Sequence, residues 1–117
     1  MSIEVEQSHV NPDITVVQIT GRLYLSNQLV STEFFLRRLI QEGTRKLVLD
    51  LTGVDRIDSA GLGTLVMCNG ELADGGGQLR LVGLQESVAE SLRVLRFDQI
   101  VSVDPDVATA CKALGAS

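Results

Sequence analysis

The stretch KLVLDLTGVDRIDSAGLG, residues 46–63, contains the two patterns that decide the fold of this chain. Its first six residues form a nearly unbroken apolar run of strand length, which is typical of a strand buried on both faces of a sheet. From Asp58 onward the sequence opens a helix that ends at the consecutive glycines 75–77. The predicted apolar face of that helix consists of Leu62, Leu65, Val66, Leu72 and Ala73. We therefore expect residues 46–51 to be the central strand of a sheet covered by helices. Residues 52–57 would then connect this strand to the helix that opens at Asp58.

The residues before this stretch predict a hairpin and a helix. Alternating apolar runs at 3–5 and 14–19 are separated by Asn11-Pro12-Asp13, which favours a tight turn. Apolar residues then recur at helical spacing over 27–42, until Gly43 ends the pattern. The apolar residues of this helix are Leu29, Phe35, Leu36, Leu39 and Ile40.

Strands and helices alternate over the rest of the chain. We expect strands at 78–82 and 100–103, with a short helix between them that places Val88, Leu92 and Leu95 on one face. Asp104 and Pro105 predict the N-cap and first position of a last helix, whose apolar face is Val107, Cys111 and Leu114. This order predicts an α/β sandwich with about four α-helices and a mixed sheet of about four to five strands that opens with a hairpin.

The composition is that of a small globular protein. The chain has 117 residues, of which 44% are apolar and 21% charged, so we expect a single domain over 1–117. No apolar run approaches the roughly 18 residues of a membrane-spanning helix, and no basic segment precedes an apolar one at the N-terminus. These features predict a cytoplasmic protein without membrane insertion. The net charge of −5 argues against a nucleic-acid partner.

Few side chains are suited to catalysis or metal binding. His9 is the only histidine, so a Ser-His-Asp triad would have to use it, and we expect a structural or surface role instead. Cys68 and Cys111 are not in a CxxC pair and are expected to be reduced, half-buried packing residues. Gly61-Leu62-Gly63 lacks the last glycine of a dinucleotide fingerprint, and no Walker lysine follows. The sequence therefore predicts no metal, no cofactor and no enzymatic activity.

The helix that begins near Ser59 is the candidate functional segment. Its first backbone N–H groups have no helical partners and the positive end of the helix dipole lies there, so an anion can rest at this position. Ser59 is the N-cap or one residue from it. In a purely structural interpretation, Ser59 is a capping hydroxyl worth ~1 kcal/mol, and Gly61 and Gly63 let the helix pack closely on the sheet. The spacing alone leaves both interpretations open.

The motif Asp58-Ser59-Ala60-Gly61-Leu62-Gly63 resembles the signature of the STAS family of bacterial anti-sigma factor antagonists, in which the serine accepts a phosphoryl group. The resemblance extends over essentially the whole chain. It includes Gly21-Arg22-Leu23, residues 46–51, Leu81-Val82-Gly83 and residues 97–114. One departure is Tyr24, which stands where the family often has an aspartate in a loop that faces the partner.

The resemblance implies a binding protein that is switched by phosphorylation of Ser59. Its partner would be an anti-sigma factor with serine-kinase activity, which supplies ATP and Mg²⁺, and a serine phosphatase is a further expected partner. The unmodified protein would bind this kinase and free a sigma factor, as a monomer or weak dimer. The expected partner-binding residues are Leu23, Tyr24, Ser26, Asn27, Asp58, Ser59, Ala60, Gly61, Leu62 and Met67.

Some alternatives remain at this stage. Met67 suits an interface or the core, and one ring of the adjacent Phe34 and Phe35 is expected to be partly exposed. STAS domains also serve in transporter-linked roles, including small subunits of lipid-transport ATPase systems, and in stress-signalling scaffolds. A small nucleotide-binding or hydrolytic enzyme is the remaining hypothesis.

Overall fold

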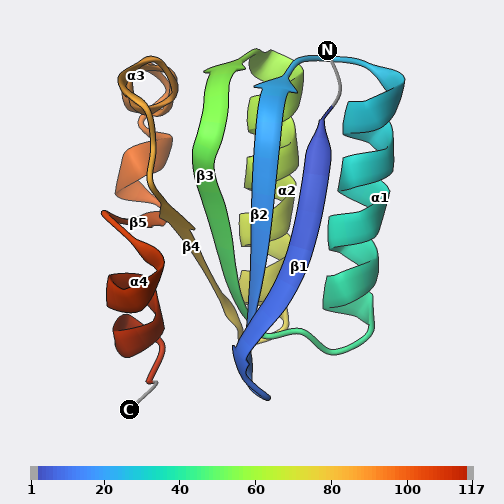
Figure 1. The fold of residues 1–117 in the computed structure, drawn as a ribbon, viewed down its shortest axis with the longest axis vertical. Coiled ribbons are helices and arrows are strands. Elements are labelled where there is room, and N and C mark those ends of the chain that lie inside the picture. The colour runs from blue at the N-terminus through green and yellow to red at the C-terminus, as the bar shows by residue number, and fades with distance from the viewer. Residues whose placement is uncertain (1–2, 116–117) are drawn as a thin grey trace.

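The computed structural model describes residues 3–115 and contains a five-stranded sheet in the order β1-β2-β3-β4-β5 (Figure 1). The strands are β1 (Glu4–Asn11), β2 (Ile14–Leu23), β3 (Lys46–Ile57), β4 (Gln78–Val82) and β5 (Ser102–Asp104). The helices are α1 (Asn27–Gln41), α2 (Ser59–Asp74), α3 (Glu86–Val94) and α4 (Val107–Ala113), with a 3-10 turn at Phe97–Gln99. Strands β1 and β2 are antiparallel and the other neighbours are parallel, so the predicted mixed sheet and opening hairpin are confirmed. Of the predicted domain, residues 1–2 and 116–117 lie outside the described residues.

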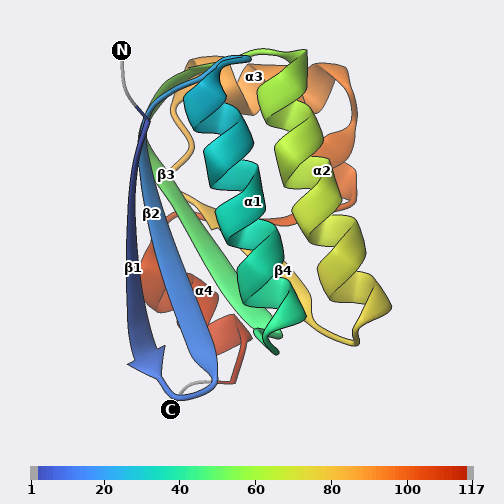
Figure 2. The ribbon, with the colours of Figure 1, turned by 90° about the vertical axis from the view of Figure 1, so that its right-hand side faces the viewer.

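The sheet is covered by helices on both faces. Helices α1 and α2 lie side by side on one face, and α4 lies on the other (Figure 2). In β3, Leu47, Leu49 and Leu51 join the larger core beneath α1 and α2, whereas Val48 packs with Cys111 of α4. The period of two in a strand explains this division, since successive side chains point to opposite faces. The predicted central strand, buried on both sides, is confirmed.

Strand β3 is longer than the sequence indicates. The expected connection after residue 51 is in fact strand, and it continues to Ile57 with a register shift against β2. Gly53 makes this possible, because a Cβ at that position would lie 2.5 Å from the Thr20 side chain. Gly53 therefore permits a close contact between β3 and β2. Because β3 extends to Ile57, Asp58 and Ser59 lie directly beyond the end of the sheet.

The start of the last helix was predicted two residues too early. Asp106, not Asp104, is the N-cap of α4, and its carboxylate accepts a hydrogen bond from the Thr109 amide at 2.8 Å. Asp104 ends β5 instead, where its carboxylate accepts two hydrogen bonds from the Arg80 guanidinium at 2.6 and 3.1 Å. The Asp104 carboxylate, which the local pattern assigned to capping, therefore takes part in an ion pair with Arg80 of the neighbouring strand.

Several residues predicted on buried helix faces are exposed. Leu95 lies just after α3 and is 62% exposed, and Val66 and Ala73 of α2 face outward. Strand β5 starts at Ser102 rather than residue 100, which leaves Ile100 68% exposed. Over residues 3–115, none of the helices combines the length and apolar character that a membrane crossing requires.

Candidate functional site

Two loops meet beyond the ends of β2 and β3, and Asp58 joins them. The Asp58 backbone N–H donates to the Leu23 carbonyl at 3.2 Å, and its Oδ2 accepts from the Leu25 amide at 2.9 Å. Its Oδ1 accepts from the Gly61 amide at 2.9 Å, which makes Asp58 the N-cap of α2. The side chain thus fixes the β2–α1 loop against the start of α2.

The Asp58 carboxylate is suited to this structural task rather than to proton transfer. Desolvation acts to raise its pKa, but the backbone N–H donors of Gly61 and Leu25 outweigh this and hold the pKa below the ordinary value. Both carboxylate oxygens already accept hydrogen bonds. Asp58 therefore stays ionised near neutral pH and is a poor general base for Ser59.

Ser59 is the first residue of α2, one position after the N-cap, and its side chain is exposed. Among the hydrogen bonds of residues 3–115, none involves the Ser59 hydroxyl. Because Asp58 supplies the cap, the capping interpretation of Ser59 is wrong and its hydroxyl stands free at the positive end of the helix dipole.

The two glycines of the motif have opposite surroundings. A Cβ on Gly61 would lie 2.2 Å from the Leu23 carbonyl oxygen, so this glycine is required where α2 packs against β2. A Cβ on Gly63 would meet nothing within 4 Å, so the expected packing role of Gly63 is wrong. Gly63 and Val66 follow Ser59 at i+4 and i+7 on the outward face of α2.

The predicted partner-binding residues gather at this end of the molecule but differ in exposure. Tyr24, Asn27 and Ser59 are exposed, whereas Asp58, Ala60 and Met67 are partly buried. Met67 packs against the core, and Ser26 caps α1 by accepting from the Leu29 amide at 3.1 Å. Leu23, Gly61 and Leu62 are buried, so they support this surface from beneath and offer little area to a partner.

Exposed apolar side chains lie on two segments that adjoin the start of α2. Tyr24 and the 74% exposed Leu25 lie on the loop that Asp58 holds. On the other side, Val94 and Leu95 line a groove that also includes Asp58 and Ser59. Leu25 lies within the loop 23–27 that was expected to face a partner, whereas no sequence pattern pointed to Val94. The helical spacing predicted a buried Leu95, and the structure exposes it instead.

Residues 6–110 match the STAS domain family. This chain belongs to the STAS family. A candidate anti-sigma factor antagonist of Thermotoga maritima is 26% identical over 98 residues, which cover 84% of this chain and 87% of that protein. A crystal structure of a candidate antagonist from that species has a TM-score of 0.87 at 23% identity, covering 96% of this chain and 95% of that one.

Two further structures show how widely this STAS fold is used. The Bacillus cell fate determinant SpoIIAA in its phosphorylated form has a TM-score of 0.76 at 13% identity, covering 95% of this chain and 99% of that one. A sulfate transporter family protein from Wolinella succinogenes has a TM-score of 0.73 at 17% identity, covering 93% of each chain. At these identities the likeness concerns the fold, which a phosphorylated cell fate determinant and a transporter family protein share.

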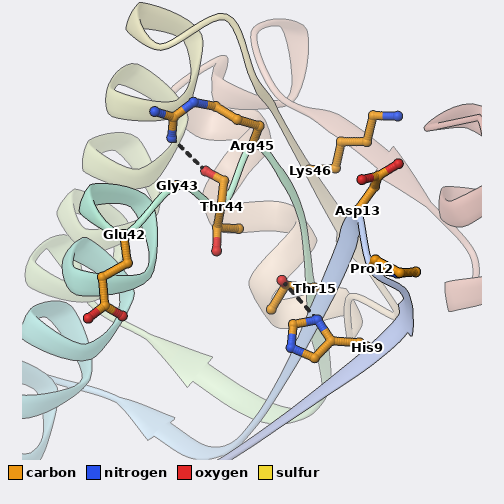
Figure 3. A pocket seen from close by; sticks show the side chains of 9 residues that line it. All are labelled: His9, Pro12, Asp13, Thr15, Glu42, Gly43, Thr44, Arg45 and Lys46. Atoms are coloured by element: carbon orange, nitrogen blue, oxygen red, sulfur yellow. Dashed lines mark hydrogen bonds between the residues drawn. The ribbon is translucent and has the colours of Figure 1, made fainter.

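A second hollow, of about 520 Å³, is lined by residues of the β1–β2 turn and of the segment between α1 and β3. Figure 3 shows its lining side chains. His9 lines it and is exposed, as predicted, with its Nδ1 3.4 Å from the Thr15 hydroxyl. The Arg45 guanidinium in this hollow already donates hydrogen bonds to the carbonyls of Ile40 and Thr44. Acidic and basic side chains are mixed in this hollow, so it has no clear preference for an anion or a cation.

The cysteines are free but fully buried rather than half-buried. Desolvation raises the pKa of the Cys68 thiol to about 12, so the reactive thiolate does not form near neutral pH. In the part of the chain that the structure describes, no group of three His, Cys, Asp or Glu side chains could hold a metal ion. Of the adjacent phenylalanines, Phe34 is exposed and Phe35 packs against the core, as expected.

Proposed function

We propose that this protein is an anti-sigma factor antagonist whose unmodified form binds an anti-sigma factor with serine-kinase activity. The kinase, with its own ATP and Mg²⁺, transfers a phosphoryl group to the Ser59 hydroxyl and the complex then dissociates. Binding of the kinase frees a sigma factor, and a serine phosphatase restores the active form. In this scheme the protein is a substrate and ligand, not a catalyst, and it acts in the cytoplasm.

The observation that carries the proposal is the free hydroxyl of Ser59 at the start of α2. The neighbouring carboxylate of Asp58 is engaged with Leu25 and Gly61, so it does not compete for the hydroxyl. A kinase can therefore approach Ser59 without first breaking an intramolecular hydrogen bond of that side chain. Exposed apolar groups on either side, Leu25 and Leu95 among them, provide area for a partner.

Phosphorylation should spare the fold and break the complex. The phosphate adds about −1.5 to −2 charge at a helix N-terminus, where the dipole stabilises an anion by about 0.3–1 kcal/mol. Within a partner interface the same dianion must lose water beside the ionised Asp58, which costs several kcal/mol unless new partners are supplied. The second effect is larger, so we expect release of the partner from an intact fold.

The resemblance to the STAS family implies that Tyr24 stands where relatives often have an aspartate. Its ring is exposed on the loop that Asp58 fixes. We propose that Tyr24 makes an apolar contact with the kinase where relatives use a charge. A change of Tyr24→Asp would then weaken binding to this chain's own partner, as measured by calorimetry.

The test uses purified protein and each ATP-binding anti-sigma kinase encoded in the same genome. Incubation with ATP, followed by mass spectrometry, should place phosphate on Ser59 and reduce the affinity for the kinase at least about 100-fold, or roughly 2.7 kcal/mol. Ser59→Ala should bind and resist modification. Ser31→Ala, which removes another exposed serine on α1, is the matched control and should behave as wild type.

A stable complex with Ser59 never modified would contradict this scheme. It would favour the alternative, a STAS subunit of a transporter-linked or scaffold complex, for which the fold shared with a sulfate transporter family protein offers limited support. Permease and transport ATPase genes beside this gene would favour the alternative, and an anti-sigma kinase gene would favour the first proposal.

A further inference from the structure

Strand β1 is a long edge of the sheet with a neighbour on one side only (Figure 1). It pairs with β2, and none of the backbone hydrogen bonds that residues 3–115 form outside the helices and the sheet involves it. Its residues from Glu4 to Val10 are all exposed. The opposite edge, β5, has only three residues. The outward backbone groups of β1 are therefore open to pairing with a further strand.

A groove with an apolar floor runs beside this edge, between β1 and α1. It encloses about 410 Å³ and is lined by Ile3, Val5 and Gln7 on the strand side and by α1 side chains that include Phe35. Ile3 and Phe35 pack against the core, so the floor is fixed in the folded state. A strand added to β1 would lie about 4.8 Å from it, and its side chains on the α1 side would stand beside Val5, within reach of the groove.

The other face of β1 carries negative charge. Glu4 and Glu6 alternate with Val5 along the strand and lie beside Thr20 and Gln18 of β2. Both glutamates are exposed, and none of the ion pairs formed by residues 3–115 includes either of them. Like charges opposite each other in a sheet are destabilising, so these glutamates discourage pairing with an acidic strand, including a second copy of β1. Lysine or arginine side chains on an added strand would instead be attracted.

We propose that β1 is a docking edge for an extended segment of another protein in which lysine or arginine alternates with apolar residues. The segment adds a strand to the sheet and bonds to the outward backbone groups of β1. Its apolar side chains enter the groove beside Phe35, and its basic side chains lie opposite Glu4 and Glu6. None of these residues belongs to the start of α2, so this contact is separate from the proposed function and does not depend on it.

The first test measures the binding of a peptide as long as β1, eight residues, in which lysine and valine alternate and both ends are blocked. Calorimetry at about 0.15 M salt, where distant charges are largely screened, should detect its binding to the purified protein. The control peptide has the same residues arranged as one run of lysines followed by one run of valines. It carries the same charge but cannot place the two residue types on opposite faces of a strand, so it should bind at least about tenfold more weakly.

Charge-reversal variants test the role of the two glutamates. The double variant Glu4→Lys/Glu6→Lys should bind the alternating peptide at least about tenfold more weakly than wild type. Asp74→Lys/Asp98→Lys is the matched control, because it changes the net charge equally at exposed positions outside β1 and the groove. It should change the dissociation constant by less than about twofold, and circular dichroism should show both variants folded.

The second test locates the bound peptide by hydrogen exchange. In an antiparallel pair, alternate amides of each strand point away from the partner strand, so alternate amides of β1 are open to solvent in the free protein. At saturating peptide these amides should exchange at least about tenfold more slowly. The amides of β5, the other edge, should be unchanged.

Several results would overturn the inference. These are failure of the alternating peptide to bind, equal binding of the two peptides, equal loss in the two charge-reversal variants, or a bound peptide that leaves the β1 amides unprotected. Protection of β1 that rises with protein concentration in the absence of peptide would assign the edge to a second copy of the chain, and would overturn it too. No kinase enters these experiments, so none of these results bears on the antagonist proposal.

Discussion

Helices α2 and α4 begin with the same local structure but differ in what surrounds it. Each has an aspartate N-cap, Asp58 or Asp106, whose Oδ1 accepts from the amide three residues later at 2.9 or 2.8 Å. In α4 the interaction stays within its own turn. In α2 the second carboxylate oxygen reaches Leu25, 33 residues earlier in the chain.

This difference shows how the start of α2 is held rigid while the Ser59 side chain stays exposed. The start of α2 is fixed by Asp58 from one side and by the contact between Gly61 and Leu23 from below. Neither constraint uses the Ser59 hydroxyl. A helix start that needs only stability, such as that of α4, requires the cap alone.

The largest expected effect comes from Gly61→Ala. Its methyl group would lie 2.2 Å from the Leu23 carbonyl oxygen, so the helix must move and the free energy of unfolding should fall by about 3 kcal/mol. Thr109, the equivalent position in α4, already carries an exposed side chain, so Thr109→Ala should cost less than about 0.5 kcal/mol. Urea denaturation measures both. A loss below about 1 kcal/mol for Gly61→Ala would mean that the start of α2 is not closely packed.

Removal of the caps should give the next largest effect. Asp58→Ala removes acceptors for the amides of both Gly61 and Leu25, so we expect a loss of about 2 kcal/mol, the upper end for a cap. Asp106→Ala removes one such acceptor and should cost clearly less. Hydrogen exchange should show faster opening at Leu25 in Asp58→Ala. Equal losses for the two variants would remove the distinction between the helix starts.

Gly63→Ala should increase the free energy of unfolding, by less than the cap variants decrease it. Its Cβ would contact nothing, and alanine is favoured over glycine in a helix by about 1 kcal/mol, so thermal unfolding should occur at a higher temperature. If this stabilised variant also binds the kinase more weakly, the glycine serves close approach of the partner. Unchanged binding would leave Gly63 without a role in the contact.

Much of the fold follows from the sequence because its patterns are local. The run 46–51 predicted a central strand buried on both faces, and the packing of Leu49 and Val48 on opposite sides bears this out. The errors arise where a distant residue overrides a local preference. Gly53 continues a strand because Thr20 lies against it, and Asp104 pairs with Arg80 instead of capping a helix.

The candidate site was only partly predictable for the same reason. The motif located Ser59 within one residue of the N-cap, since small and polar residues mark a helix start. The link from Asp58 to Leu25 joins segments that only the fold brings together. The exposure of Leu95 follows from the end of α3 at Val94, and the apolar spacing gave no indication of that end.

The smallest expected effect is the contribution of Asp58 to the pH dependence of the free energy of unfolding. The folded-state pKa of Asp58 lies below the ordinary value of 3.8, so the unfolded chain binds the proton more readily. The contribution of Asp58 is therefore complete well above pH 3.8 and is lost as the pH falls through the lower, folded-state pKa. Asp58→Asn cannot titrate, and its amide group cannot accept from both Gly61 and Leu25, so it should be less stable than wild type at pH 7.

As the pH falls below about 3.8, the gap between wild type and Asp58→Asn should narrow, because protonated Asp58 loses its advantage over the amide. Urea midpoints measured from pH 7 to pH 2.5 would follow this gap. Asp106→Asn is the matched control, since the Thr109 amide likewise lowers the pKa of Asp106. Both gaps should close in acid, but only in Asp58→Asn should the Leu25 amide already exchange faster at pH 7. If the stability difference between wild type and Asp58→Asn stayed constant down to pH 2.5, the charge of Asp58 would not contribute to holding the two loops together. The shape of the side chain alone would then account for the contact.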